Sequence, residues 1–158
     1  MPCIDSGKKL FAIAALALLS ACSTPMPERT SGGARSGAPL AAGNLPAPGS
    51  VRNWSDVRLQ AARRLVAANP GGTYTGTVPD MLLAIPVLEI ELNGDGSIRR
   101  IDVLRRPGQA PETLQMAIDA VRRAAPFGDV SRLPKPWKFS ETFLFNDERK
   151  FKPRTLDN

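Results

Sequence analysis

The stretch VLEIELNGDGSIRRIDVLR, from Val87 to Arg105, decides the fold class of this chain. Apolar and polar residues alternate on both sides of the sequence NGDG, Asn93 to Gly96, and alternation with a period of two is typical of a strand that is buried on one face. Asn-Gly and Asp-Gly pairs between two such runs are typical of hairpin turns. The stretch therefore predicts an antiparallel β-hairpin.

The hairpin is expected to have an apolar inner face and a charged outer face. Two registers keep the apolar residues inward, and they differ in whether Glu89 or Glu91 lies opposite Arg100. In both registers the outer face is an ion-paired, solvated surface. The residues expected to face inward are Leu88, Ile90 and Leu92 in the first strand and Ile101 and Val103 in the second.

Segments with helical periodicity flank the hairpin. The first helix is expected to begin after the cap residue Asn53 and to end at the run Asn69 to Gly72, because Asn, Pro and Gly terminate helices. The second helix is expected within PETLQMAIDAVRRAAPFG, residues 111–128, whose apolar residues fall on one stripe. Both helices are therefore predicted to pack on the sheet.

A third strand is expected in WKFSETFLFND, residues 137–147, where apolar residues alternate on one face and Glu141 alone interrupts them. The tail is expected to add a short final strand at Phe151, at a sheet edge, because Pro153 lacks a ladder donor. The order helix, strand, strand, helix, strand predicts an α+β fold, a small antiparallel sheet with two helices packed on it. The aromatic residues expected in its core are Trp137, Phe139, Phe143 and Phe145.

The first 21 residues are typical of an export signal, since two lysines precede an apolar run, residues 10–21, about half as long as a membrane-spanning helix. The sequence LSAC, Leu19 to Cys22, resembles the lipobox of bacterial lipoproteins, whose cysteine receives a diacylglycerol and becomes the first residue. This resemblance implies acyl chains such as palmitate on Cys22 and, with Ser23 next, sorting to the outer membrane. The alternative is an incidental cysteine inside a discarded signal.

Residues 22–52 are expected to be the lipidated cysteine followed by a disordered tether. The segment is rich in Pro, Gly, Ser and Ala and has no hydrophobic period, so it cannot bury enough surface to offset its ordering entropy. A flexible tether of this length has a root-mean-square span of about 30 Å. The folded domain is expected to comprise residues 53–158.

Three pieces of the chain together resemble the C-terminal domain shared by TonB and TolA, over roughly residues 54–145. They are the hairpin, the helix sequence LQMAIDAVRRAAPFG with its closing Ala-Pro-Phe, and the apolar strand KFSETFLF. The resemblance implies an exposed strand edge that accepts an extended segment of a partner protein through main-chain hydrogen bonds. That edge is expected at residues 138–145, with Lys138, Ser140 and Thr142 on its outward face. The alternative is that this strand belongs to the core and that the tail covers its edge.

No catalytic constellation is evident in the sequence. The chain contains no histidine, which removes the commonest general base near neutral pH, the Ser-His and Cys-His nucleophile pairs and the commonest zinc ligand. Glu89 and Glu91 lie together on the hairpin, but a solvated strand face carries such residues without any catalytic role. We therefore predict that the chain is not an enzyme and that it needs no metal or cofactor.

Arginine is the remaining functional signal, since the formal net charge is +6 and four dibasic pairs occur. Nucleic acid is not expected as the partner of an exported protein, whereas lipopolysaccharide phosphates and anionic lipid headgroups are reasonable targets. The other interpretation is that dispersed basic residues keep a small domain soluble. The pairs are Arg63 and Arg64, Arg99 and Arg100, Arg105 and Arg106, and Arg122 and Arg123.

The sequence thus predicts a non-catalytic lipoprotein of the outer membrane whose domain faces the periplasm. Its expected partners are the membrane, through the N-terminal lipid, and an envelope protein, through strand addition. The alternative function is binding of an anionic envelope surface through the arginine pairs.

Overall fold

The computed structural model describes residues 45–157, and the expected signal peptide, Cys22 and most of the expected tether lie outside this range. None of the helices within the described range is long and apolar enough to cross a lipid bilayer. The elements follow in the order α1 (Trp54–Ala68), β1 (Val87–Leu92), β2 (Ile98–Arg105), α2 (Glu112–Ala124), β3 (Lys138–Phe145), β4 (Phe151–Pro153) and the 3-10 turn η1 (Arg154–Leu156).

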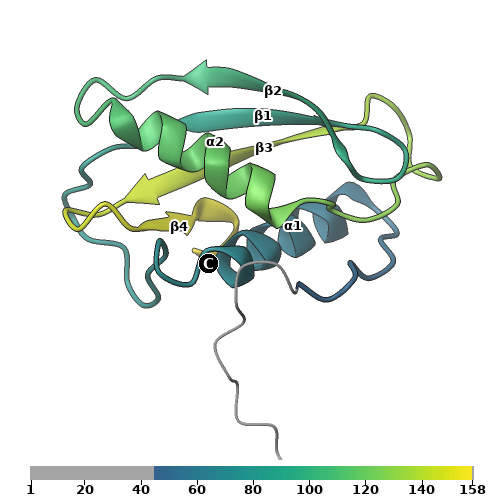
Figure 1. Cartoon of the computed structure of the whole chain (residues 1–158), viewed down its shortest axis with the longest axis horizontal. Coiled ribbons are helices and arrows are strands. Elements are labelled where there is room, and N and C mark those ends of the chain that lie inside the picture. Colours follow the sequence, from purple (N-terminus) through teal and green to yellow (C-terminus); the bar gives the residue numbers. More distant parts are fainter. Residues whose placement is uncertain (1–44, 158) are drawn as a thin grey trace, which may run out of the picture. The chain divides into compact units, whose positions relative to one another are not determined.

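The four strands form one antiparallel sheet in the order β2-β1-β3-β4 (Figure 1). The predicted α+β fold, an antiparallel sheet with two helices, is therefore confirmed. Strands β1 and β2 are the predicted hairpin, with Ile90 opposite Ile101 on the inner face. Of the two predicted registers, the one that places Glu91 opposite Arg100 is confirmed.

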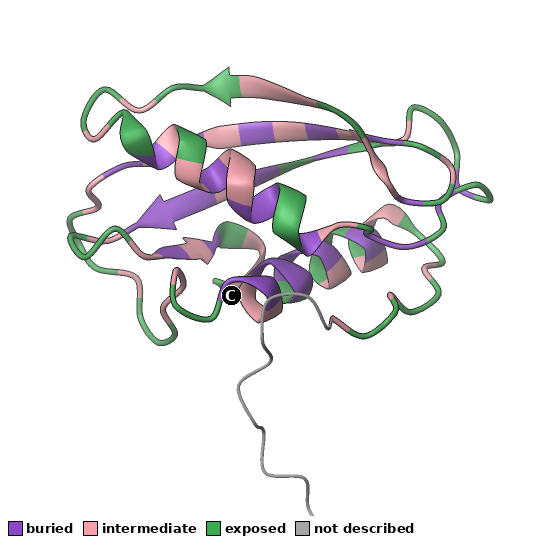
Figure 2. Cartoon of the chain, viewed as in Figure 1, coloured by how far each residue is buried: buried purple, intermediate pink, exposed green. Residues whose placement is uncertain are grey.

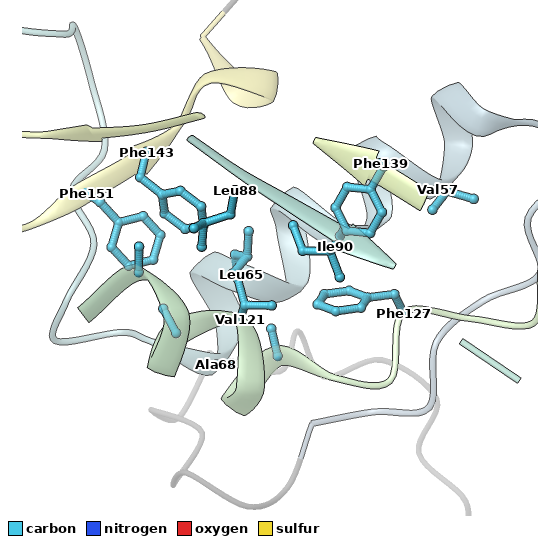
Figure 3. Packing of buried hydrophobic residues seen from close by; sticks show 14 of the residues in the cluster. Val57, Leu65, Ala68, Leu88, Ile90, Val121, Phe127, Phe139, Phe143 and Phe151 are labelled. Carbon is cyan, nitrogen blue, oxygen red and sulfur yellow. The ribbon is translucent and has the colours of Figure 1, made fainter. Parts of the chain in front are cut away.

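Both helices pack on one face of the sheet, and the hydrophobic core lies between them and the strands (Figure 2). Figure 3 shows Leu65 of α1 and Val121 of α2 facing Ile90 of β1 across this core. The rings of Phe127 and Phe139 meet edge to face, with their centroids 5.5 Å apart. Full burial of one such large apolar side chain contributes about 1.5–3 kcal/mol. The core therefore provides most of the favourable free energy of folding.

The side chain of Asn69 joins the C-terminal ends of the two helices. Its Nδ2 donates to the carbonyl oxygens of Leu65 at 2.7 Å and of Ala120 at 3.3 Å. Its Oδ1 accepts a hydrogen bond of 2.7 Å from Nε of Arg123. The residue that the sequence marks as the end of the first helix thus also fixes α1 against α2.

The hairpin turn is held against the segment that follows α2. Phe127 N–H donates to the carbonyl oxygen of Gly96 at 2.9 Å, and Val130 N–H donates to that of Gly94 at 2.8 Å. Gly96 has a φ of 81°, and a Cβ atom built on it would overlap the backbone of Gly128. Glycine is therefore required at this turn both for its backbone conformation and for the close approach.

The folded part of the chain begins before the predicted boundary at Asn53, because residues 45–52 pack on α1. Leu45 and Val51 lie against the hydrophobic core. Nη1 of Arg64 donates to the carbonyl oxygen of Pro46 at 2.7 Å, and Nε2 of Gln60 donates to that of Gly49 at 3.2 Å. Composition alone placed this segment in the tether, since it has no helical or strand period. Hydrogen bonds from α1 side chains to the carbonyl groups of Pro46 and Gly49 hold it on the helix instead.

Candidate functional site

The predicted binding edge at residues 138–145 is wrong, because β3 lies inside the sheet. Residues 138–142 pair with β1, and residues 143–145 pair with β4. The alternative, that the tail covers this edge, holds in the structure for residues 143–145, which pair with β4. Lys138 and Ser140 are exposed on the outer face of the sheet and Thr142 is half-buried there, with Nζ of Lys138 3.0 Å from a carboxylate oxygen of Glu89. The short final strand expected at Phe151 is present as β4, but three residues are too few for a periodic pattern to indicate which strand they pair with.

Beyond the end of β4, the carboxylate of Glu141 links β3 to η1. Glu141 is 2% exposed, and its Oε1 accepts hydrogen bonds from the backbone N–H groups of Thr142 at 3.1 Å and Thr155 at 3.2 Å. Burial raises the pKa of this carboxyl, and its hydrogen bonds to Thr155 and Thr142 oppose the shift. The backbone N–H of Thr142 points away from β1, and its hydrogen bond to Glu141 makes it unavailable to a partner's strand.

The outer side of β4 is also covered. Phe151 N–H donates to the carbonyl oxygen of Gly72 at 2.9 Å, and Tyr74 N–H donates to that of Phe151 at 3.2 Å. The chain after α1 thus runs alongside this short strand. On this side the sheet offers no long row of unpaired backbone groups within residues 45–157.

The opposite edge of the sheet, formed by β2, is open. Among the described residues β2 pairs only with β1, and Figure 1 shows it as the outermost strand. At both ends of β1 the even-numbered residues form their backbone hydrogen bonds on the β3 side. Leu92 N–H donates to Trp137 O at 2.8 Å, and Pro86 O accepts from Phe143 N–H at 3.0 Å. Since backbone groups alternate along a strand, Glu89 and Glu91 bond toward β2. On β2 the outward backbone groups are therefore those of Ile101 and Val103.

Irregular pairing limits the usable part of this edge. The β1–β2 register shifts between Val87 and Leu88 and again between Glu91 and Leu92. Such bulges twist a strand and shorten the stretch that another strand can follow. The regular part of β2 is residues 100–103, which contains both outward residues.

Charged side chains surround the open edge. Nε of Arg100 lies 2.9 Å from Oδ2 of Asp102 and 3.5 Å from Oε2 of Glu91, and its side chain is 66% exposed. Nη1 of Arg99 lies 3.3 Å from Oε1 of Glu91. Exposed ion pairs of this kind contribute about 0–1 kcal/mol each. Their effect is therefore to set the charge pattern of the edge rather than the stability of the domain.

The arginine pairs do not form one surface. Arg64 is buried, its Nε donates to the carbonyl oxygen of Ala124 at 2.9 Å, and burial lowers the pKa of its guanidinium. Arg123 bonds Asn69, and Nη1 of Arg122 lies 3.3 Å from Oδ1 of Asp119. Arg99, Arg100 and Arg105 lie in β2, whereas Arg63 and Arg64 lie in α1, which Figure 1 shows on the opposite side of the sheet. Within residues 45–157 no ion pair involves Arg63, Arg105 or Arg106.

The sequence did not identify the β2 edge as the candidate site. Alternation shows that one face of a strand is buried, but it does not show which strands are neighbours in the sheet. In the described part of the chain, no group of three or more Cys, Asp or Glu side chains is arranged to hold a metal ion. No family model, no curated protein and no solved structure matches this chain.

Proposed function

We propose that this chain is a non-catalytic outer-membrane lipoprotein whose periplasmic domain binds an envelope protein by strand addition at β2. The observation that carries this proposal is the open edge, where the N–H and C=O groups of Ile101 and Val103 point away from β1. An extended segment of a partner can pair with these groups as an additional strand. The lipobox-like sequence at Cys22 supports the anchor and the location, and the proposal involves no metal or cofactor.

The size of the edge indicates weak, reversible binding. Ile101 and Val103 together offer two N–H and two C=O groups, and each hydrogen bond contributes a net stabilisation of about 0.5–1.5 kcal/mol. Backbone pairing alone is therefore worth a few kcal/mol, whereas micromolar affinity needs about 8 kcal/mol. Side chains beside the edge must supply the rest, and Leu104, which is 56% exposed, is available for such a contact.

Strand addition is better supported than the alternative, binding of an anionic envelope surface. Five of the eight arginines in the dibasic pairs already contact groups within the domain: Arg64, Arg99, Arg100, Arg122 and Arg123. A surface that binds lipopolysaccharide or phospholipid needs cations gathered on one face. By contrast, the outward backbone groups of Ile101 and Val103 lie together on one open edge and are available to a strand.

A proline substitution tests the proposal, since proline removes one backbone donor. In Val103→Pro the lost N–H points outward, so pairing with β1 is kept, whereas in Asp102→Pro the lost N–H bonds toward β1. We would express full-length protein with a photoreactive residue at Leu104 and identify its crosslinked partners in cells by mass spectrometry. Val103→Pro should abolish the adduct with another envelope protein and keep cooperative unfolding. An undiminished adduct in the folded variant would refute strand addition at β2.

Asp102→Pro is the matched control for backbone damage. It should lower the unfolding temperature far more than Val103→Pro, because a ladder hydrogen bond is lost. A second crosslinking position at Ser140, exposed on the interior strand β3, reports binding to the outer face of the sheet. Partners captured equally well from Ser140 and Leu104 would place the contact on that face and not on the edge.

A further inference from the structure

The edge of β2 is complementary to itself. We infer that β2 pairs with β2 of a second copy of this chain, antiparallel, with the two-fold axis at Ile101. The inference rests on the proposed function, because it concerns the same open edge and regulates access to it. A self-paired edge is closed to a partner's segment until the second copy leaves.

Backbone direction restricts the possible pairings to three. Only Ile101 and Val103 point their N–H and C=O groups outward within the regular part of β2. In an antiparallel two-fold pairing, each of these residues must form hydrogen bonds with Ile101 or Val103 of the second copy. The axis can therefore lie at Ile101, at Asp102 or at Val103.

Charge selects the first of these pairings. With the axis at Ile101, Arg100 of each copy lies opposite Asp102 of the other, and Arg99 lies opposite Val103. With the axis at Asp102, the two aspartates face each other and Arg99 lies opposite Arg105. Like charges directly opposite on paired strands are destabilising, and opposite charges are stabilising. The remaining pairing, with its axis at Val103, places two arginines opposite each other.

By sequence count that remaining pairing sets Arg100 against Arg106 of the second copy, a residue beyond the end of β2. The axis at Ile101 is thus the only pairing of the three that sets opposite charges against each other within the regular stretch, residues 100–103. It also places Arg100 and Asp102 in non-hydrogen-bonded pairs, where Cα atoms are about 4.5 Å apart and side chains are closest. Since Arg100 and Asp102 already lie 2.9 Å apart in one copy, the pairing creates an alternating cluster of four charges.

The short regular stretch makes this a weak dimer, so it forms where copies are concentrated. Attachment of many copies to one membrane raises their effective concentration for each other. Because the dimer is weak, a partner segment that binds β2 more tightly than a second copy does displaces that copy. Self-pairing therefore reversibly protects the edge of β2 from non-specific pairing with strands of other proteins.

Reciprocal charge reversal tests the inference in the full-length, membrane-attached protein. Photocrosslinking from Leu104 should give an adduct of twice the chain mass that contains only this chain. Arg100→Asp places two like pairs of aspartates across the axis, and Asp102→Arg places two like pairs of arginines there. Each variant expressed alone should lose at least tenfold of this adduct.

Coexpression of the two variants, distinguished by peptide tags, is the decisive step. Asp at position 100 and Asp102 of one copy then face Arg at position 102 and Arg100 of the other, so the mixed adduct should return to the original level. Recovery also shows that both variants fold. Failure of the mixed adduct to return, or unchanged adducts in the single variants, would overturn the inference.

The two proposals fail in different ways. If adducts with another envelope protein depend on Val103 N–H but the self-adduct is absent, only the self-pairing is wrong. If the self-adduct behaves as expected and no other protein is captured, only the proposed function is wrong. Met81, which is 86% exposed and lies before β1, is the control position for random collisions, and its self-adduct should stay at background.

Discussion

Gly96 and Gly128 lie in direct backbone contact, so the tip of the β1–β2 hairpin and the segment after α2 approach more closely than any side chain permits. Both residues have positive φ, 81° and 108°. The contact joins the turn that defines the hairpin to the chain that leads into β3. The position of the hairpin tip against this segment therefore depends on the absence of a side chain at Gly96.

The first prediction is that Gly96→Ala strongly destabilises the domain. A left-handed backbone costs a non-glycine residue about 1–2 kcal/mol, and displacement of the Gly128 carbonyl adds to this. Urea unfolding of full-length protein measures the change. Gly108→Ala is the matched control, since no heavy atom lies within 4 Å of its Cβ position, and it should stay within about 0.5 kcal/mol. Equal stability of the two variants would contradict the close contact.

The second prediction concerns Glu141 and pH. Because burial raises the pKa of its carboxyl in the folded protein, protonation of Glu141 favours folding. This contribution is fully present below the unfolded pKa and is lost as pH rises through the raised folded pKa. Glu141→Gln keeps an oxygen acceptor but does not ionise, so its stability relative to the original protein should increase from about pH 4 to about pH 8.

Unfolding curves at several pH values in that range measure the difference between the two proteins. Glu148→Gln provides a contrast of opposite sign, because its hydrogen bond to Lys150 lowers the pKa of Glu148. Its relative stability should decrease over the same range. A difference for Glu141→Gln that does not change with pH would show that the folded protein does not hold the proton of Glu141 more tightly than the unfolded chain.

The third prediction is that Arg64 holds residues 45–51 on the domain. Arg64→Ala leaves the carbonyl oxygens of Pro46 and Ala124 without their charged donor, a loss on the order of 2–4 kcal/mol. Denaturant unfolding measures the loss, and limited proteolysis should detect faster cleavage within residues 45–51. Arg63→Ala, one residue earlier and exposed, should change neither measurement. Slow cleavage in a destabilised Arg64→Ala protein would show that other contacts hold the segment.

Much of the fold could be predicted from the sequence because its signals are local. The NGDG turn and the alternation around it define the hairpin, and the inward residues leave only the choice between Glu89 and Glu91 opposite Arg100. Asn53 caps α1 as expected, since its Oδ1 accepts a 2.9 Å hydrogen bond from Asp56 N–H. Each of these features depends on residues within a few positions of one another.

The site could not be predicted because it depends on which strands are neighbours. Residues 138–145 have the pattern of a half-buried strand whether or not β4 pairs beside them. That pairing follows from the turn at Asn146, whose N–H donates to Lys150 O at 2.9 Å, and from the chain near Gly72 that covers β4. The edge consequently lies at β2, and Glu141, visible as a polar interruption, acquires its contact with η1 only in the folded chain.

The attachment of residues 45–51 to α1 also sets how the domain is suspended. The segment that begins at Leu45, the first residue that the structure describes, is held by Arg64 of α1 through Pro46, while β2 lies at the far side of the sheet (Figure 1). A tether that continues from this segment therefore joins the domain on the α1 side, opposite β2. A partner's segment can pair with the edge of β2 without displacing residues 45–51.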